Sequence, residues 1–130
     1  MATPAQASGF CAQIKAALQP DVKTDGVVAA GLDAKCAKSL TLGGGSSTNC
    51  FWRFEYRAAA ATEFFERLLM DVVNCIGTPE TTTRDKGVNH PDFYDLRQFS
   101  SEFGTVGLSL KDKGGLQETY VFLRLTPKIP

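Results

Sequence analysis

Two segments of the chain have hydrophobic residues at the spacing of an amphipathic helix. In residues 58–75 an alanine-rich start is followed by apolar positions three or four residues apart, with Gly77 and Pro79 marking the end. The apolar positions of this segment are Phe65, Leu68, Leu69, Val72 and Ile76. Residues 10–19, opened by a Ser-Gly pair, show a shorter version of the pattern and stop before Pro20. The pattern predicts one long helix and one short N-terminal helix.

A strand hairpin is predicted between these helices. Residues 36–42 and 48–57 flank a run of three glycines, which suits a turn between paired strands. In the second segment Trp52, Phe54 and Tyr56 alternate with charged residues, so one face of that strand is aromatic. These rings either fill the core against the long helix or form one wall of a pocket for a hydrophobic ligand.

Three further strands are predicted in the last third of the chain, at residues 93–101, 105–111 and 117–126. The turns between them are short and contain glycine, which favours an antiparallel meander. The apolar positions that we expect to face inward from the last two strands are Val106, Leu108, Leu110, Val121, Leu123 and Leu125.

The outer face of the last strand carries an aromatic and cationic set. Alternation places Tyr120, Phe122 and Arg124 opposite the apolar positions of that strand. Aromatic residues and arginine are enriched in the hot spots of binding surfaces, so these three are candidate partner-binding residues. The alternative is that another segment of the chain covers this face.

Two segments lack a clear pattern. Residues 27–35 fit either a strand or a short helix, and residues 78–91 have no periodicity, which predicts a long surface loop. Loops of that length in compact domains are usually functional or mobile, so this one is a second candidate partner-binding region. Its side chains that can hydrogen-bond a polar partner are Arg84, Asp85, Lys86 and His90.

Together these elements predict an α+β domain in the order α-β-β-α-β-β-β. An antiparallel sheet of about five strands packs one face against the long helix and the short N-terminal helix. The length of 130 residues fits a single domain, and a content of 43% hydrophobic and 22% charged residues excludes a disordered chain.

Charge and hydropathy exclude two classes of partner. The 14 Lys and Arg residues balance the 14 Asp and Glu residues, so no net field draws the chain onto nucleic acid. The longest apolar run is interrupted by Glu66, Arg67 and Asp71, which excludes a membrane span.

The four cysteines predict two disulfides. Cys36 and Cys50 lie at equal distances from the middle of the glycine turn, so a hairpin places them opposite each other. Cys11 and Cys75 lie on the apolar faces of the two predicted helices, so a bridge between the helices is expected. Four cysteines allow three connectivities, and the pattern ranks this one first without excluding the others. The cysteines lack the spacing of a zinc or redox motif, and the alternative is four buried thiols.

The N-terminus and the cysteines together indicate export. Residues 5–7, Ala-Gln-Ala, have the form of a signal-peptidase site, so residues 1–7 are expected to be a remnant of a signal peptide and residues 8–130 the domain. The alternative is an N-terminal tail of a cytosolic protein. Because disulfides persist in oxidising compartments, we expect a periplasmic or secreted protein.

No familiar catalytic set is present in the sequence. The only histidine is His90, and there is no G-x-S-x-G motif, phosphate-binding loop or zinc motif, so we expect neither an enzyme nor a cofactor or metal. The acidic pairs Glu63 with Glu66 and Asp92 with Asp95 are interpreted as solvated surface groups. A hydrolase centred on His90, with Asp92 and Asp95, is a remote alternative.

The functional expectation is a non-enzymatic exported protein that binds another protein. The specific expectation is an inhibitor or immunity protein against a cell-wall-degrading enzyme or toxin, by analogy with small exported domains that hold two disulfides. The alternative from another class is a module that binds hydrophobic small molecules or lipid through the aromatic strand.

Overall fold

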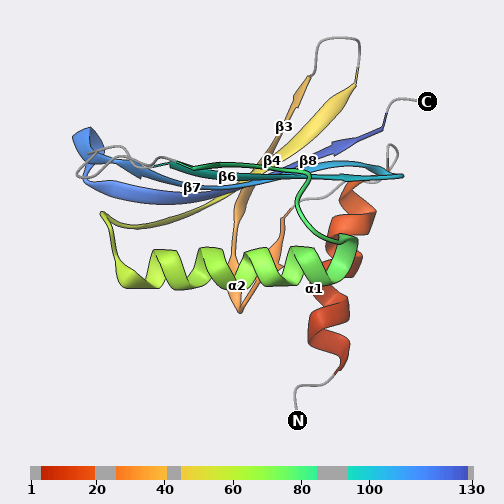
Figure 1. Cartoon of the computed structure of the whole chain (residues 1–130), viewed down its shortest axis with the longest axis horizontal. Coiled ribbons are helices and arrows are strands. Elements are labelled where there is room, and N and C mark those ends of the chain that lie inside the picture. The colour runs from red at the N-terminus through yellow and green to blue at the C-terminus, as the bar shows by residue number, and fades with distance from the viewer. Residues whose placement is uncertain (1–3, 20–25, 41–44, 85–93, 129–130) are drawn as a thin grey trace.

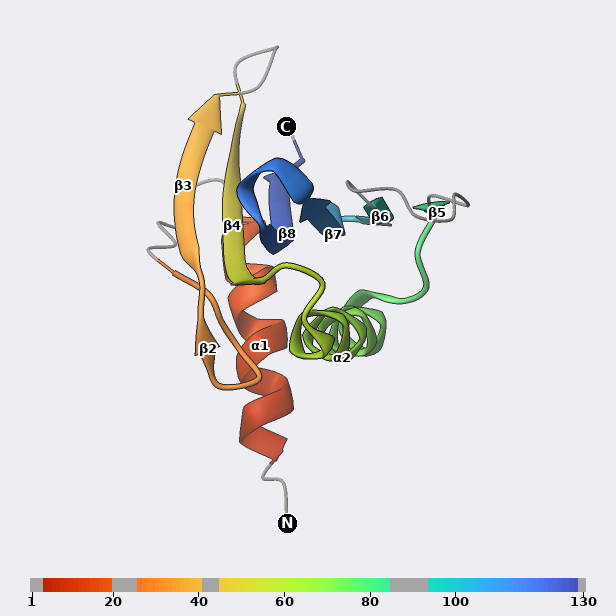
Figure 2. The same ribbon diagram turned by 90° about the vertical axis from the view of Figure 1, so that its left-hand side faces the viewer.

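The computed structural model shows a six-stranded antiparallel sheet with two helices on one side, together with a small two-stranded hairpin (Figure 1, Figure 2). It describes residues 4–19, 26–40, 45–84 and 94–128, with side chains from residue 9 onward. The helices are α1 (Pro4–Ala17) and α2 (Ala59–Ile76). The strands are β1 (Val28–Ala29), β2 (Leu32–Asp33), β3 (Lys35–Leu40), β4 (Ser46–Glu55), β5 (Thr81–Arg84), β6 (Tyr94–Ser101), β7 (Gly104–Lys113) and β8 (Glu118–Pro127). The predicted α+β fold is confirmed.

The strand order in the sheet is β3-β4-β8-β7-β6-β5, and every neighbouring pair is antiparallel. The pairs β3–β4, β5–β6, β6–β7 and β7–β8 join strands that are neighbours in the chain. The pair β4–β8 joins the first hairpin to the C-terminal meander. As a result, α2 carries the chain from β4 across the helix side of the sheet to its far edge at β5 (Figure 2).

The hydrophobic core lies between the sheet and the two helices. The inward positions predicted for the last two strands are all buried, which confirms the predicted phase of both strands. From α2 the core receives Ala61, Phe64, Phe65, Leu68 and Val72, and from α1 and the residue after it the core receives Phe10, Ile14, Ala17 and Leu18.

The N-terminal helix begins earlier than predicted. It starts at Pro4, inside the segment 1–7 that we expected to be a remnant or tail, and it ends at Ala17 rather than at residue 19. Proline is favourable at the first helical position, because its missing N–H has no partner in the helix there, and alanine favours helix beyond it. Among the described residues, no helix is long and apolar enough to cross a membrane.

Residues 27–35, for which the sequence left helix and strand open, contain the β1–β2 hairpin. Its turn residues Ala30 and Gly31 have φ values of 49° and 79°, as a tight hairpin turn requires. The Gln13 side chain holds this hairpin to α1, since its amide donates to the Val28 carbonyl at 3.0 Å and accepts from the Val28 N–H at 2.8 Å.

The prediction of one long loop over residues 78–91 is wrong for its first part. Residues Thr81–Arg84 form β5, the edge strand that pairs with β6. Three consecutive threonines are β-branched and therefore favour an extended backbone, even though no apolar alternation is present. This strand raises the sheet from the predicted five strands to six.

Both predicted disulfides are present. Cys36 and Cys50 are directly opposite in the β3–β4 register, and Cys11 of α1 is bonded to Cys75 of α2 with a Cα–Cα distance of 5.4 Å. The second bridge fixes α1 against the C-terminal end of α2. Two disulfides are compatible with an oxidising environment.

We predict that the two disulfides differ in their contribution to stability. The Cys11–Cys75 bridge joins residues 64 apart in the sequence and the Cys36–Cys50 bridge joins residues 14 apart. The chain-entropy argument gives about 4 kcal/mol for the first loop and about 3 kcal/mol for the second. Urea unfolding of the two double Cys→Ala variants measures both values, and a larger loss for the Cys36→Ala/Cys50→Ala variant would contradict this order.

A second prediction concerns the contact between α1 and the β1–β2 hairpin. Gln13→Ala removes both hydrogen bonds to Val28 and is expected to lower the free energy of unfolding by about 1 kcal/mol. Gln19→Ala, at an exposed position just after α1, is the matched control and should change it by less than about 0.5 kcal/mol. Equal effects in urea unfolding would show that the Gln13 contact does not hold the hairpin.

Candidate functional site

The face of the sheet opposite the helices carries a cluster of three aromatic rings. Register places Phe51 of β4 opposite Phe122 of β8, with Tyr120 beside them. The rings of Tyr120 and Phe122 are stacked with centroids 5.5 Å apart, and Phe51 lies 5.9 Å from Tyr120 and 6.3 Å from Phe122. We call Phe51, Tyr120, Phe122 and Arg124 the outer-face cluster. It contains all three residues that the sequence predicted for this face.

Phe51 is the member of this cluster that sequence reasoning missed. It lies on β4, 71 positions before Phe122 in the sequence, and comes next to it only through the β4–β8 pairing. Alternation within β4 places Phe51 and Arg53 opposite the inward Trp52, and this pattern was visible in the sequence. The sequence did not show which strand pairs with β4 at Phe51.

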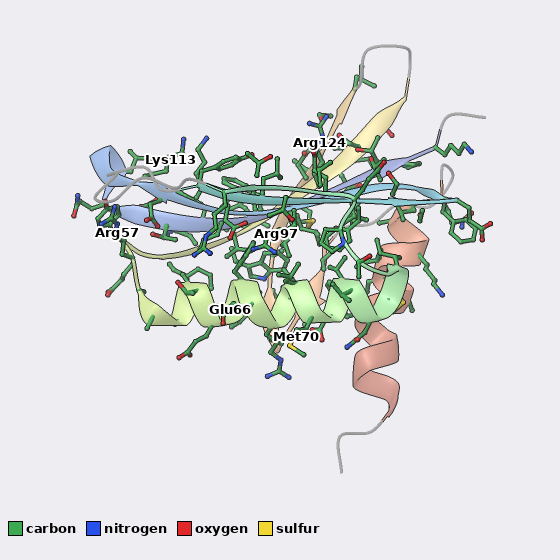
Figure 3. The ribbon with its side chains drawn as sticks, viewed as in Figure 1. Arg57, Glu66, Met70, Arg97, Lys113 and Arg124 are labelled. Carbon is green, nitrogen blue, oxygen red and sulfur yellow. A yellow bond between two sulfur atoms is a disulfide. The ribbon has the colours of Figure 1, made fainter. Side chains whose placement is uncertain are left out.

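Cations surround the rings. Register places Lys35 of β3 opposite Phe51 and Arg53 of β4 opposite Tyr120. Arg124 is exposed in the next outward position of β8, and Figure 3 shows it on the side of the sheet away from α2. Farther along the same face, the Lys111 ammonium lies 5.7 Å from the centre of the Tyr94 ring. The outer face therefore combines flat apolar groups with positive charge.

Glu118 is an acidic residue at the border of this surface and lies opposite Glu55 of β4. Its carboxylate accepts a hydrogen bond from the Tyr120 hydroxyl and lies 3.7 Å from an Nη atom of Arg53. The hydrogen bond to Glu118 is the main cause that raises the pKa of Tyr120 above its usual value. Tyr120 is therefore a neutral hydrogen-bonding group at physiological pH.

The rings of the outer-face cluster are half-buried, and Arg124 is exposed. Both described helices lie on the other side of the sheet (Figure 2), so no helix of the described part of the chain covers these residues. Beside the cluster lies a hollow of about 480 Å³, lined by Phe51, Tyr120, Lys35, Arg53 and the β2 residues. The shape is suited to receive a projecting side chain of a partner.

The loop residues predicted as a second binding region are not brought to this face. Arg84, the last residue of β5, faces the helix side, where its Nε lies 3.6 Å from a carboxylate oxygen of Asp95. Asp85, Lys86 and His90 lie outside the described residues. The structure therefore places Arg84 and the outer-face cluster on opposite faces of the sheet.

The aromatic face of β4 fills the core. Trp52 and Phe54 pack on Phe64 of α2 with ring centroids 5.0 Å and 5.5 Å apart, and the Trp52 Nε1–H donates to the Leu32 carbonyl at 3.1 Å. Of the two roles that the sequence allowed for these rings, the structure shows packing against the long helix, and Trp52 and Phe54 also line the hollow beside the outer-face cluster. Tyr56, farther along, lies 5.1 Å from the guanidinium of Arg57.

A cluster of charged side chains lies on the helix side of the sheet, at the border of the core. The interpretation of Asp95 as a solvated group is wrong, because Asp95 is only 4% exposed. Its carboxylate accepts two hydrogen bonds from Arg97, at 2.8 Å and 3.2 Å. The alternation of β6 puts Asp95 and Arg97 in phase with the buried Phe99, and this was the available signal. Glu63 and Glu66 are exposed, as expected.

A second buried carboxylate ties the end of β4 to β7 and β8. Asp112 accepts a hydrogen bond from the Thr119 hydroxyl at 2.7 Å and from Nε of Arg57 at 3.1 Å. The Thr119 hydroxyl in turn accepts from the backbone N–H of Arg57 at 2.8 Å. Arg57 has a φ of 54°, an uncommon value for a residue with a side chain, and these hydrogen bonds hold it there.

Between these charged groups and α2 lies a cavity of about 420 Å³, which we call the helix-side cleft. Asp95, Arg97 and Asp112 line its sheet side, and α2 closes the other side. The hydrogen bond to Asp95 is the main cause that raises the pKa of Arg97 further, so this guanidinium stays charged. Within the described residues, no three His, Cys, Asp or Glu side chains are close enough to hold a metal ion.

Comparison of the chain with protein-family models, with curated proteins and with solved structures found no match.

We predict that Thr119→Val disrupts the charged network. The substitution keeps the shape of the buried side chain but removes the hydrogen bond that Thr119 accepts from the Arg57 N–H and the one that it donates to Asp112, at a cost of about 2 kcal/mol. Thr105→Val, at an exposed position of β7, is the control and should change the free energy of unfolding by less than about 0.5 kcal/mol. If thermal unfolding shows the two variants to be equal, the Thr119 network contributes nothing.

Proposed function

We propose that this chain is an exported, non-enzymatic protein that binds another protein through the outer-face cluster. The observation that carries the proposal is the convergence of Phe51, Tyr120 and Phe122 on one face, with Arg124 beside them. Tyrosine, phenylalanine and arginine are enriched at protein interfaces, where ring burial supplies affinity and charge supplies orientation. A rigid sheet loses little conformational freedom when it binds.

Export is part of the proposal and is supported by the two disulfides. One bridge joins α1 to α2, which no sheet hydrogen bonds connect, and the other cross-links β3 to β4 within the sheet. Such bonds persist outside the reducing cytosol. The proposed location is the periplasm or the extracellular space.

The proposed partner is a cell-wall-degrading enzyme or toxin, with this chain as its inhibitor or immunity protein. The cleft of a typical glycoside hydrolase holds two carboxyl groups about 5 to 9.5 Å apart and accommodates the flat faces of sugar rings. Arg53, Lys35 and Arg124 match the charge of such a cleft, and the rings of the outer-face cluster match its shape. Complementary charge also speeds association and favours the correct partner.

Binding rather than catalysis is favoured by how the buried charges are used. The buried carboxylates of Asp95 and Asp112 both accept hydrogen bonds from arginine side chains. Buried carboxylates paired in this way hold elements together in many proteins. We therefore assign the carboxylates of Asp95 and Asp112 a role in holding the fold together and in ligand recognition.

The test is inhibition of purified cell-wall-degrading enzymes. We expect the purified protein to slow at least one enzyme of a panel of peptidoglycan glycosidases, amidases and endopeptidases when present at micromolar concentration. Phe122→Ser and Arg124→Glu should each weaken that inhibition by about tenfold or more. Arg67→Glu, at an exposed position of α2 on the opposite side, is the matched control and should leave inhibition unchanged.

Two results would contradict the proposal. One is the absence of inhibition across the panel, which would remove the inhibitor or immunity role. The other is inhibition that Arg67→Glu abolishes while Phe122→Ser and Arg124→Glu leave it intact, which would place the interface on the helices.

A further inference from the structure

The helix-side cleft is a preformed cavity that the proposed protein-binding face does not use. It lies between α2 and the sheet, whereas the outer-face cluster lies on the other side of the sheet (Figure 3). Its volume of about 420 Å³ is within the range of sites for small molecules. Two small side chains line it, Ala58 just before α2 and Thr62 on α2, and their size leaves this space open beside the charged residues of the sheet.

The sheet wall of the cleft carries both arginines and carboxylates, and Arg97 has more N–H groups than its carboxylate partner uses. The Arg97 guanidinium has five N–H groups, and Asp95 accepts from its Nε and one Nη atom. The remaining N–H groups have no acceptor among the described residues, and the side chain is 22% exposed toward the cleft. Asp95, by contrast, also receives the charge of Arg84 at 3.6 Å. A ligand group that pairs with the remaining N–H groups of Arg97 must be a hydrogen-bond acceptor, and a negative charge on that group strengthens the contact.

The charge of Arg97 is held in position before any ligand arrives. The two hydrogen bonds to Asp95 fix the plane of the guanidinium, and Asp95 is almost fully buried. Figure 3 shows Arg97 in the space between the sheet and α2. A charged donor with a fixed orientation loses little side-chain entropy on binding, and guanidinium geometry suits a two-point contact with a carboxylate or phosphate.

The other walls of the cleft are apolar. Phe65 and Leu69 line it from α2, and Leu110 lines it from β7. Phe65 and Leu110 are buried, so an apolar ligand body placed against them is removed from water. Glu66, also at the cleft, is exposed, so its negative charge is screened by solvent.

We propose that the helix-side cleft binds a small organic anion, with the anionic group on Arg97 and an apolar body against Phe65, Leu69 and Leu110. Carboxylates and phosphates share the recognition chemistry. The site is separate from the outer-face cluster, so ligand binding here and protein binding there are independent functions of the two faces of one sheet.

The experiment compares ligands that share one body. 4-Phenylbutanoate, 4-phenylbutanol and 4-phenylbutylamine differ only in the charge of the head group, and phenyl phosphate tests the alternative anion. We expect at least one of the two anions to bind with a dissociation constant below about 1 mM in calorimetric titration. The alcohol and the amine should bind at least about tenfold more weakly, because they lack the charge that Arg97 recognises.

Two variants locate the site. Arg97→Gln should weaken binding of the anion by about tenfold or more. Thr62→Trp fills the cleft from an exposed position of α2 and replaces no residue of the charged network, so it should abolish binding even if Arg97→Gln destabilises the fold. Arg67→Gln, at an exposed position of α2 that does not line the cleft, is the matched control and should bind the anion like the unmodified protein.

Methyl and aromatic NMR spectra of the same samples distinguish the cleft from other surfaces. The anion should shift the signals of Leu69 and Leu110 and leave the ring signals of Phe122 unchanged. The proposal is overturned if neither anion binds, if the alcohol or the amine binds as tightly as the acid, or if Thr62→Trp binds the anion with full affinity.

Discussion

The pairing of β4 with β8 is the contact on which the rest of the structure depends. It joins the N-terminal hairpin to the C-terminal meander through a continuous register from Thr48 opposite Leu125 to Glu55 opposite Glu118. Because alternate residues face opposite sides of a sheet, this one register sets both faces. Trp52 and Val121 enter the core, and Phe51 and Phe122 meet on the outside. A shift by one residue would exchange the two faces, so burial of the core fixes the position of the outer rings.

The two faces then differ in their chemistry because the helices cover only one of them. On the outer face the aromatic rings stay half-buried and the cations of β3, β4 and β8 surround them. On the helix side, the sheet is apolar around Leu108 and Leu123 and charged around Asp95 and Asp112. Burial of charge is costly unless each group has a partner, and in the described part of the chain every buried side-chain polar atom has one. The charged sheet wall of the cleft therefore lies at the end of the hydrophobic core, where hydrogen bonds between its own side chains fix it in position.

The local parts of this architecture could be predicted from the sequence. The helical phase of Cys11 and Cys75 and the position of Cys36 and Cys50 about the glycine turn ranked the observed pairing first among three, because each bridge depends on the geometry of its own elements. The β4–β8 pairing could not be predicted, since strand partners far apart in the chain are chosen by the whole core. The sequence did not predict β5, because its threonines show no apolar alternation. It did not predict the burial of Asp95, because a charged residue near an arginine usually lies in solvent. Asp85, Lys86 and His90 remain predictions, since the structure does not describe them.

The most direct test of the central claim, that the β4–β8 register brings Phe51 and Phe122 together on the outer face, is a double-mutant cycle. The free energies of unfolding of Phe51→Ala, Phe122→Ala and the double variant give the coupling between the two rings, which we expect to be about 0.5 to 1 kcal/mol. The same cycle for Phe51 and Tyr94, which lie on the same face but on strands that are not neighbours, should give a coupling near zero. A coupling near zero for Phe51 and Phe122 would contradict the register, and with it the outer-face cluster.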